Sequence, residues 1–185
     1  MYGSRPHFTV YWLAAVFIAG ALQGCASGVT RSTDSAPSKP YFADSSTKAG
    51  NVLVSLTPEA QAKLADNLKF DQEKLRSTIR RALEAKNLIS PAPEASLPVI
   101  EVVVRDVRTR SNFTAVAFGF LAGNDHINGD VVVRDPGGRE LQRFGVSAAY
   151  ALGGLGGGQD DARMGWLYET FAKHTVEELT GTAAP

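Results

Sequence analysis

Four stretches of the chain alternate apolar and polar residues with a period of two, which predicts four β-strands. They are Asn51–Leu56, Val99–Val107, Ile127–Arg134 and Glu140–Tyr150. The last two flank Pro136-Gly137, and a proline followed by a glycine is typical of a tight turn, in which Gly137 is free to take a positive φ. The pattern therefore predicts that these last two strands form a hairpin.

Other stretches place apolar residues three and four positions apart, which predicts helices. One helix is expected to begin at Thr57-Pro58-Glu59 and another at Asp71, because hydroxyl and carboxylate side chains cap helix N-termini. Asn87 fits the left-handed position after the second helix, and a last helix is expected from Asp160 to Gly181. Together these elements predict an α+β fold, with a small mixed or antiparallel sheet of about four strands and helices packed on one face.

The N-terminal region has a different pattern. An apolar run from Val10 to Leu22 is shorter than the roughly 20 residues that cross a bilayer, and has the length of a signal-peptide core. It ends in Leu22-Gln23-Gly24-Cys25, which resembles the lipobox of bacterial lipoproteins, with Leu22 and Gly24 at the positions that the signal peptidase reads. Cys25 is the chain's single cysteine. The resemblance implies that Cys25 is acylated and becomes the first residue.

Three regions follow from this pattern. Residues 1–24 are expected to be the signal peptide, residues 25–50 the lipidated cysteine and a flexible tether, and residues 51–181 the folded domain. Tyr41 and Phe42 could dock on the domain or add an edge strand. No aspartate follows Cys25 directly, which resembles the sorting rule for the outer membrane. The expected location is the inner leaflet of the outer membrane, facing the periplasm, with an uncleaved membrane anchor as the alternative.

Charge and composition narrow the function classes. Lysine and arginine number 19, as do aspartate and glutamate, so nucleic acid is not an expected partner. One cysteine excludes an intramolecular disulfide. The membrane, through acylated Cys25, is the expected partner, together with another envelope protein or a second copy of the chain.

Two glycine-rich apolar segments carry the remaining signal. They are Phe113–Gly123 and Tyr150–Gly158, and the hairpin predicts that they leave the sheet at one end. If exposed, they would form a surface for a partner, the membrane or self-association. If buried, their glycines would permit a close backbone crossing, and the need for a helix to cover the sheet favours burying most of them. The residues predicted for the surface are Phe113, Phe118, Phe120, Leu121, Tyr150, Leu152 and Leu155.

The order of these segments resembles a family of bacterial lipoproteins, domain of unknown function 4410. The resemblance rests on Phe113–Gly123, on Ile127–Asp135, on the glycine run Ala151–Gly158 and on Trp166–Leu179. It covers roughly Asn51 to Gly181. It implies an envelope location and an α+β fold, and it implies no reaction and no catalytic residue. At the level of fold, the domain also resembles periplasmic modules of envelope-assembly lipoproteins, including activators of peptidoglycan synthases.

Enzyme chemistry finds little support in the sequence. Ser147, then Asp160 or Asp161, then His174 follow the order of a serine hydrolase, but the strand through Ser147 lacks the sharp turn of a nucleophile elbow. The glycine run ending at Gly158 lacks the lysine of a phosphate loop. A metal site at Asp125, His126 and Asp130 would need a turn to converge. No catalytic residue, cofactor or metal is therefore predicted.

Three functions remain. The first is non-enzymatic binding or scaffolding of another envelope component. The second is a subunit of an oligomeric, membrane-associated assembly, and the third a periplasmic serine hydrolase.

Overall fold

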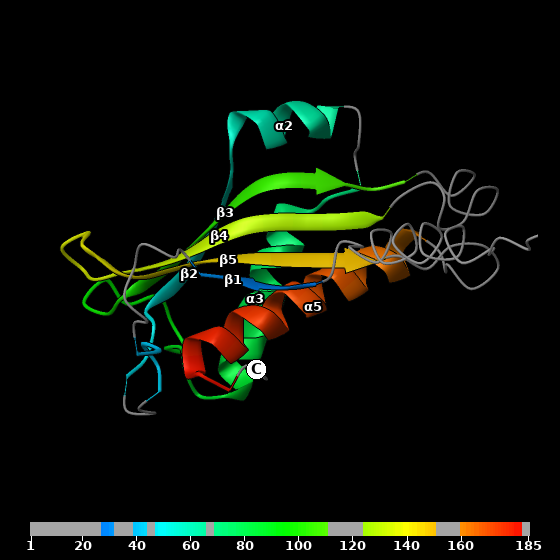
Figure 1. Ribbon diagram of the computed structural model, residues 1–185. Helices are drawn as coiled ribbons and strands as arrows, with labels where there is room; N and C mark the ends of the chain where they lie inside the picture. Colours follow the sequence, from blue (N-terminus) through cyan, green and yellow to red (C-terminus); the bar gives the residue numbers. More distant parts are fainter. Residues whose placement is uncertain are drawn as a thin grey trace, which may run out of the picture.

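The computed structural model describes residues 27–31, 39–43, 47–65, 69–110, 124–150 and 160–182. Their strands form one five-stranded sheet in the order β1-β5-β4-β3-β2 (Figure 1). The strands are β1 (Gly28–Thr30), β2 (Asn51–Leu56), β3 (Val99–Arg108), β4 (Asp125–Arg134) and β5 (Glu140–Tyr150). The helices are α2 (Pro58–Ala65), α3 (Gln72–Ala85) and α5 (Asp160–Thr180). The predicted α+β class is confirmed, with one strand more than expected.

The sheet is mixed. β3, β4 and β5 run antiparallel to one another, whereas β2 lies parallel to β3 and is joined to it through α2 and α3. A parallel pair needs such a crossover. Helices α3 and α5 contact each other and cover one face, while α2 lies beside β3, on its other side in Figure 1.

The predicted local signals act as expected. The Asp71 carboxylate accepts a hydrogen bond from the Lys74 backbone N–H at 3.0 Å and caps α3. Asn87 takes a positive φ of 56° after the helix, and the Leu88 N–H then donates to the carbonyl of Leu83 at 2.9 Å.

The hairpin turn differs in one detail. Gly138, not Gly137, takes the positive φ, at 85°. The Gly138 N–H donates to the Asp135 carbonyl at 2.9 Å, and the Asp135 N–H donates to the carbonyl of Arg139 at 2.9 Å. The left-handed residue therefore follows the two central turn residues, as in hairpins with one extra loop residue.

The core lies between the sheet and the helix pair. Its largest fully buried side chains include Phe144, Tyr168 and Phe171. Gly129 faces this core, where an added Cβ would lie 3.0 Å from the Val103 carbonyl and 3.4 Å from the Phe171 ring. The glycine in the middle of β4 thus lets α5 approach the sheet closely.

The segment expected to be a tether packs on the domain over its described residues. Gly28–Thr30 pairs with Gly145–Ser147 as the extra strand, and the Phe42 side chain is only 2% exposed. The Phe42 N–H donates to the Leu179 carbonyl at 2.9 Å, and Arg31 forms a two-point ion pair with the buried carboxylate of Glu178. These described residues therefore pack on the domain, whereas the composition of the segment predicts a loose tether. Phe42 docks, as one of the two alternatives proposed, and the edge strand comes from Gly28–Thr30 instead.

Candidate functional site

The sheet face opposite α3 and α5, called the open face below, carries the polar side chains of three adjacent strands. Their residues alternate with the core residues, so each strand sends every second side chain to this face. The register places Asp106, Asn128 and Ser147 in one row and Arg108, His126 and Ala149 in the next. The polar members of the open face include Glu101, Arg105, Asp106, His126, Asn128, Asp130, Arg134, Arg143 and Ser147.

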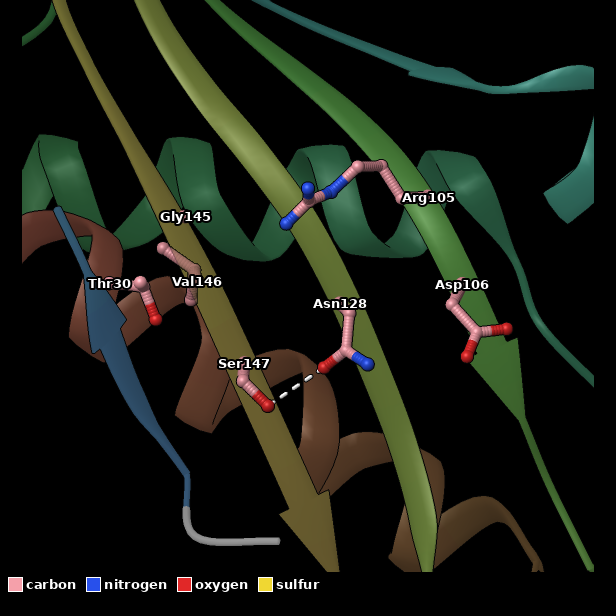
Figure 2. A pocket seen from close by; sticks show the side chains of 7 residues that line it. All are labelled: Thr30, Arg105, Asp106, Asn128, Gly145, Val146 and Ser147. Atoms are coloured by element: carbon pink, nitrogen blue, oxygen red, sulfur yellow. Dashed lines mark hydrogen bonds between the residues drawn. The ribbon is translucent and has the colours of Figure 1, made fainter. Parts of the chain in front are cut away.

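A hollow of about 370 Å³ lies on the open face, where β1 joins the sheet. Its lining consists of Thr30, Arg105, Asp106, Asn128, Gly145, Val146 and Ser147 (Figure 2). Two glycines leave room here. An added Cβ would find nothing within 4 Å at Gly28, and at Gly145 it would come no closer than 3.6 Å to Arg105 and Thr30. Small residues in β1 and β5, next to long side chains from β3, thus produce the concavity.

The register shift between Val104 and Asp106 explains how two consecutive side chains of β3, those of Arg105 and Asp106, both reach the open face. A bulge of this kind inserts an extra residue and re-aims its side chain. Arg105 reaches across β4 to Asp130 at 3.3 Å, with 55% of its side chain exposed. The next side chain, Asp106, has different partners.

Asp106 binds a lysine and a histidine. Its carboxylate lies 2.6 Å from the Lys63 ammonium of α2 and 2.9 Å from Nε2 of His126. Partial burial opposes ionisation of Asp106, but the hydrogen bonds from Lys63 and His126 outweigh it and lower its pKa below the usual 3.8. Asp106 is therefore a carboxylate at neutral pH.

Ser147 lies in the hollow as a hydrogen-bond donor. Its Oγ donates to Oδ1 of Asn128 at 2.7 Å (Figure 2). His174 belongs to α5, which covers the other face, and its Nδ1 lies 3.3 Å from Glu177. Ser147 and His174 are thus on opposite sides of the sheet, so the structure does not assemble the hydrolase triad considered above.

The three residues considered as a metal site also lie on different faces of the sheet. Asp125 lies on the helix side of β4, whereas His126 and Asp130 lie on the open face, where they contact Asp106 and Arg105. Within the described ranges, no group of three or more histidine, aspartate, glutamate or cysteine side chains could hold a metal ion. What the open face offers is binding chemistry: charged, hydroxyl and amide groups around a small concavity.

A second cluster lies at the end of the sheet where β3 and β5 finish. Asp125 is 1% exposed and accepts hydrogen bonds from the Arg110 backbone at 2.6 Å and from its guanidinium at 3.2 and 3.3 Å. Arg163, in the first turns of α5, lies 3.4 Å from the same carboxylate. Arg163 also donates to the Arg110 carbonyl at 3.1 Å, and Arg110 to that of Tyr150 at 3.4 Å. One buried carboxylate thus joins β3, β4, β5 and α5.

Most of the residues predicted from the sequence as functional lie outside the described part of the chain. These are Leu22, Gly24, Cys25, Phe113, Phe118, Phe120, Leu121, Leu152 and Leu155. Tyr150 is described, half-buried, with its ring 5.2 Å from that of Trp166. Asp125 pairs with Tyr150 in the β4–β5 register, so the chain enters β4 and leaves β5 at the same end of the sheet, as the hairpin predicts.

Sequence reasoning missed both polar clusters. For the open face a signal was present, because His126, Asn128 and Asp130 alternate with apolar residues in β4. The pairing of Arg110 and Arg163 with Asp125 had no such signal, since the residues are far apart in sequence. No helix among the described residues combines the length and apolarity that crossing a bilayer requires.

These features define a class: a small α+β domain with a mixed five-stranded sheet, one helix-covered face and one open polar face. The chain belongs to the family named "Domain of unknown function (DUF4410)", whose model matches residues 32–154.

Solved structures give distant similarity. The PelC dodecamer from Paraburkholderia phytofirmans is 13% identical, with a TM-score of 0.40, over 80% of this chain and 98% of that chain. A dodecamer of the same protein with a single substitution has a TM-score of 0.37 at the same identity and coverage. Protein XCC0632 from Xanthomonas campestris is 12% identical, with a TM-score of 0.42, over 71% of this chain and 82% of that one. No curated protein sequence matches the chain.

Proposed function

We propose that this chain is a lipid-anchored, non-enzymatic protein of the bacterial envelope that binds a polar partner on its open face. The observation that carries the binding part is the hollow between Arg105, Asn128 and Ser147, on a sheet face that α3 and α5 leave uncovered. The lipidation part rests on the Leu22–Cys25 pattern and on the absence of any other cysteine.

The position of Ser27 sets how far an acylated Cys25 would lie from the folded domain. Ser27 follows Cys25 by two residues, and its Oγ accepts from the Ala149 N–H at 2.8 Å and donates to the Ala149 carbonyl at 3.3 Å. Two residues span at most about 7 Å. An acylated Cys25 would therefore hold the end of β5 close to the lipid surface, rather than at the end of a long tether.

The charges of the open face support a polar partner. Arg134 pairs with Glu101 at 2.7 Å, and Arg105 with Asp130 at 3.3 Å, so basic and acidic groups alternate across the strands. Pairs of this kind hold side chains in fixed positions while leaving hydrogen-bonding capacity for a ligand. A partner with mixed charge and hydroxyl or amide groups fits this pattern best.

The sheet edge at β2 gives self-association little support. The Val54 carbonyl accepts a hydrogen bond from the Gln72 side chain at 2.7 Å, and the Val52 N–H donates to the Asn51 side chain at 2.9 Å. These side chains occupy backbone groups that a strand from a second copy would need. We therefore place partner binding on the open face rather than on this edge.

Site-specific photocrosslinking in cells tests the binding proposal. A photoreactive residue at Ser147 or Arg105 is expected to capture a specific envelope component, because both side chains border the hollow. The matched control is Lys74, which is exposed on α3 on the other side of the molecule.

Adding the charge reversal Arg105→Glu to the Ser147 crosslinker should abolish capture, since it places two like charges beside one another at Asp130. Crosslinks of equal yield from Ser147 and Lys74, or none from either open-face position, would count against the open face as the binding surface.

A further inference from the structure

The end of the sheet near Ser27 carries an exposed aromatic side chain. Trp166 is 42% exposed, and among the described residues only Leu53, at 46%, is another large apolar side chain so open to solvent. The Trp166 ring packs edge-on against that of Tyr150, with ring centroids 5.2 Å apart and planes at 65°. The two aromatic rings come from α5 and from the last residue of β5.

This aromatic pair lies beside the acylation site predicted at Cys25. Tyr150 follows Ala149, whose backbone is hydrogen-bonded to Ser27 in both directions. Cys25 is two residues, or at most about 7 Å of chain, before Ser27. An acyl anchor and the aromatic pair would thus meet the same membrane surface.

The helix surface around Trp166 leaves room for a bulky neighbour. One turn earlier the exposed residue is Ala162, and next to Trp166 stands Gly165, where an added Cβ would meet no atom within 4 Å. The nearby Arg163 is turned inward, 3% exposed, against Asp125. The next exposed charge toward the C-terminus is Glu169. Among the described residues, the helix surface from Ala162 to Trp166 therefore carries no exposed charge, and the exposed Asp161 and Glu169 bound it on either side.

We propose that the Trp166–Tyr150 pair is the membrane contact of the domain, and that it inserts into the headgroup region of the lipid leaflet that holds Cys25. The proposal rests on the proposed lipid anchoring. Indole and phenol rings favour this region, because an apolar ring and a polar N–H or O–H suit the boundary between water and hydrocarbon. Acyl chains alone leave a domain free to rotate. A second contact would fix its orientation, and with it the direction in which the open face points.

The test uses the chain's own tryptophan and cysteine. The sequence has two tryptophans, and removal of residues 1–24 leaves Trp166 alone. The mature chain is coupled through Cys25 to a maleimide lipid in phosphatidylcholine vesicles that contain spin-labelled lipids. Coupling should shift Trp166 emission to the blue. Quenching by labels near the headgroup should exceed quenching by labels at the acyl-chain end by more than about twofold.

The matched control moves the reporter. In a Trp166→Phe, Leu53→Trp variant, the tryptophan lies on β2 opposite Glu101. Arg108 marks the other end of β3, in the same row as Ala149, and is about 23 Å along the strand from Glu101. The tryptophan on β2 should show no shift and no quenching. Unchanged Trp166 emission after coupling would overturn the membrane contact. Equal quenching of the tryptophans at positions 166 and 53 would overturn it as well. Chemical coupling bypasses cellular acylation, so failure of Cys25 lipidation in cells would be a separate result, against the proposed function.

Discussion

Replacing Asp125 with asparagine is expected to destabilise the domain by about 3–5 kcal/mol, because it leaves the buried guanidinium groups of Arg110 and Arg163 without their carboxylate. The substitution conserves shape, so the effect isolates charge. The Arg110 backbone N–H, 2.6 Å from Asp125, also loses a charged acceptor. In a thermal melt of the unlipidated mature chain, the midpoint should fall by about 10–20 °C.

The control is the same substitution on the same strand at Asp130. That carboxylate pairs at 3.3 Å with Arg105, whose side chain is 55% exposed. Pairs of this kind contribute about 0–1 kcal/mol. Asp130→Asn should therefore leave the melting midpoint nearly unchanged. Equal effects of the two substitutions would show that the Asp125 cluster is not buried as described.

Truncating Phe42 to alanine is expected to cost about 3–5 kcal/mol, as for other fully buried aromatic side chains. Phe42 is 2% exposed, packs edge-on against Tyr41 at 5.0 Å, and lies where its backbone meets the end of α5 at Leu179. Chemical denaturation of the mature chain gives the free energy of unfolding. A large loss would show that the residues after the anchor belong to the cooperative domain.

Leu53→Ala serves as its comparison. Leu53 is 46% exposed on β2, so its truncation should change the free energy of unfolding by no more than about 0.5 kcal/mol. If Phe42→Ala were equally mild, the segment before β2 would behave as the loose tether that its composition suggests.

The elements that the sequence predicts correctly are those marked by signals within a few residues. Asp71 and Asn87 mark helix ends through hydrogen bonds to residues within five positions, so the information lies in a short window. β1 escapes prediction because it has only three residues and no alternation to read. Its pairing is with β5, and the Ser27–Ala149 bond that extends it joins residues 122 positions apart.

The polar clusters escape for a related reason. Arg110, Asp125 and Arg163 look like ordinary surface charges in the sequence, and only the meeting of β3, β4 and α5 buries them together. Arg105 and Asp106 are consecutive residues, and both side chains reach the open face only because β3 has a bulge there, which pattern analysis does not detect. The sequence does predict that two glycine-rich segments leave the sheet at one end. The pairing of Asp125 with Tyr150 in the β4–β5 register agrees with that prediction.

The most direct test of the proposed function is whether Cys25 carries lipid. Cells expressing the full chain are grown with a clickable fatty-acid analogue, and the protein is recovered from the membrane fraction. The wild-type chain should be labelled and membrane-bound, whereas Cys25→Ser should be unlabelled, since the chain has no other cysteine. Equal labelling of the two chains, or an unlabelled wild-type chain, would contradict the account of a lipid-anchored envelope protein.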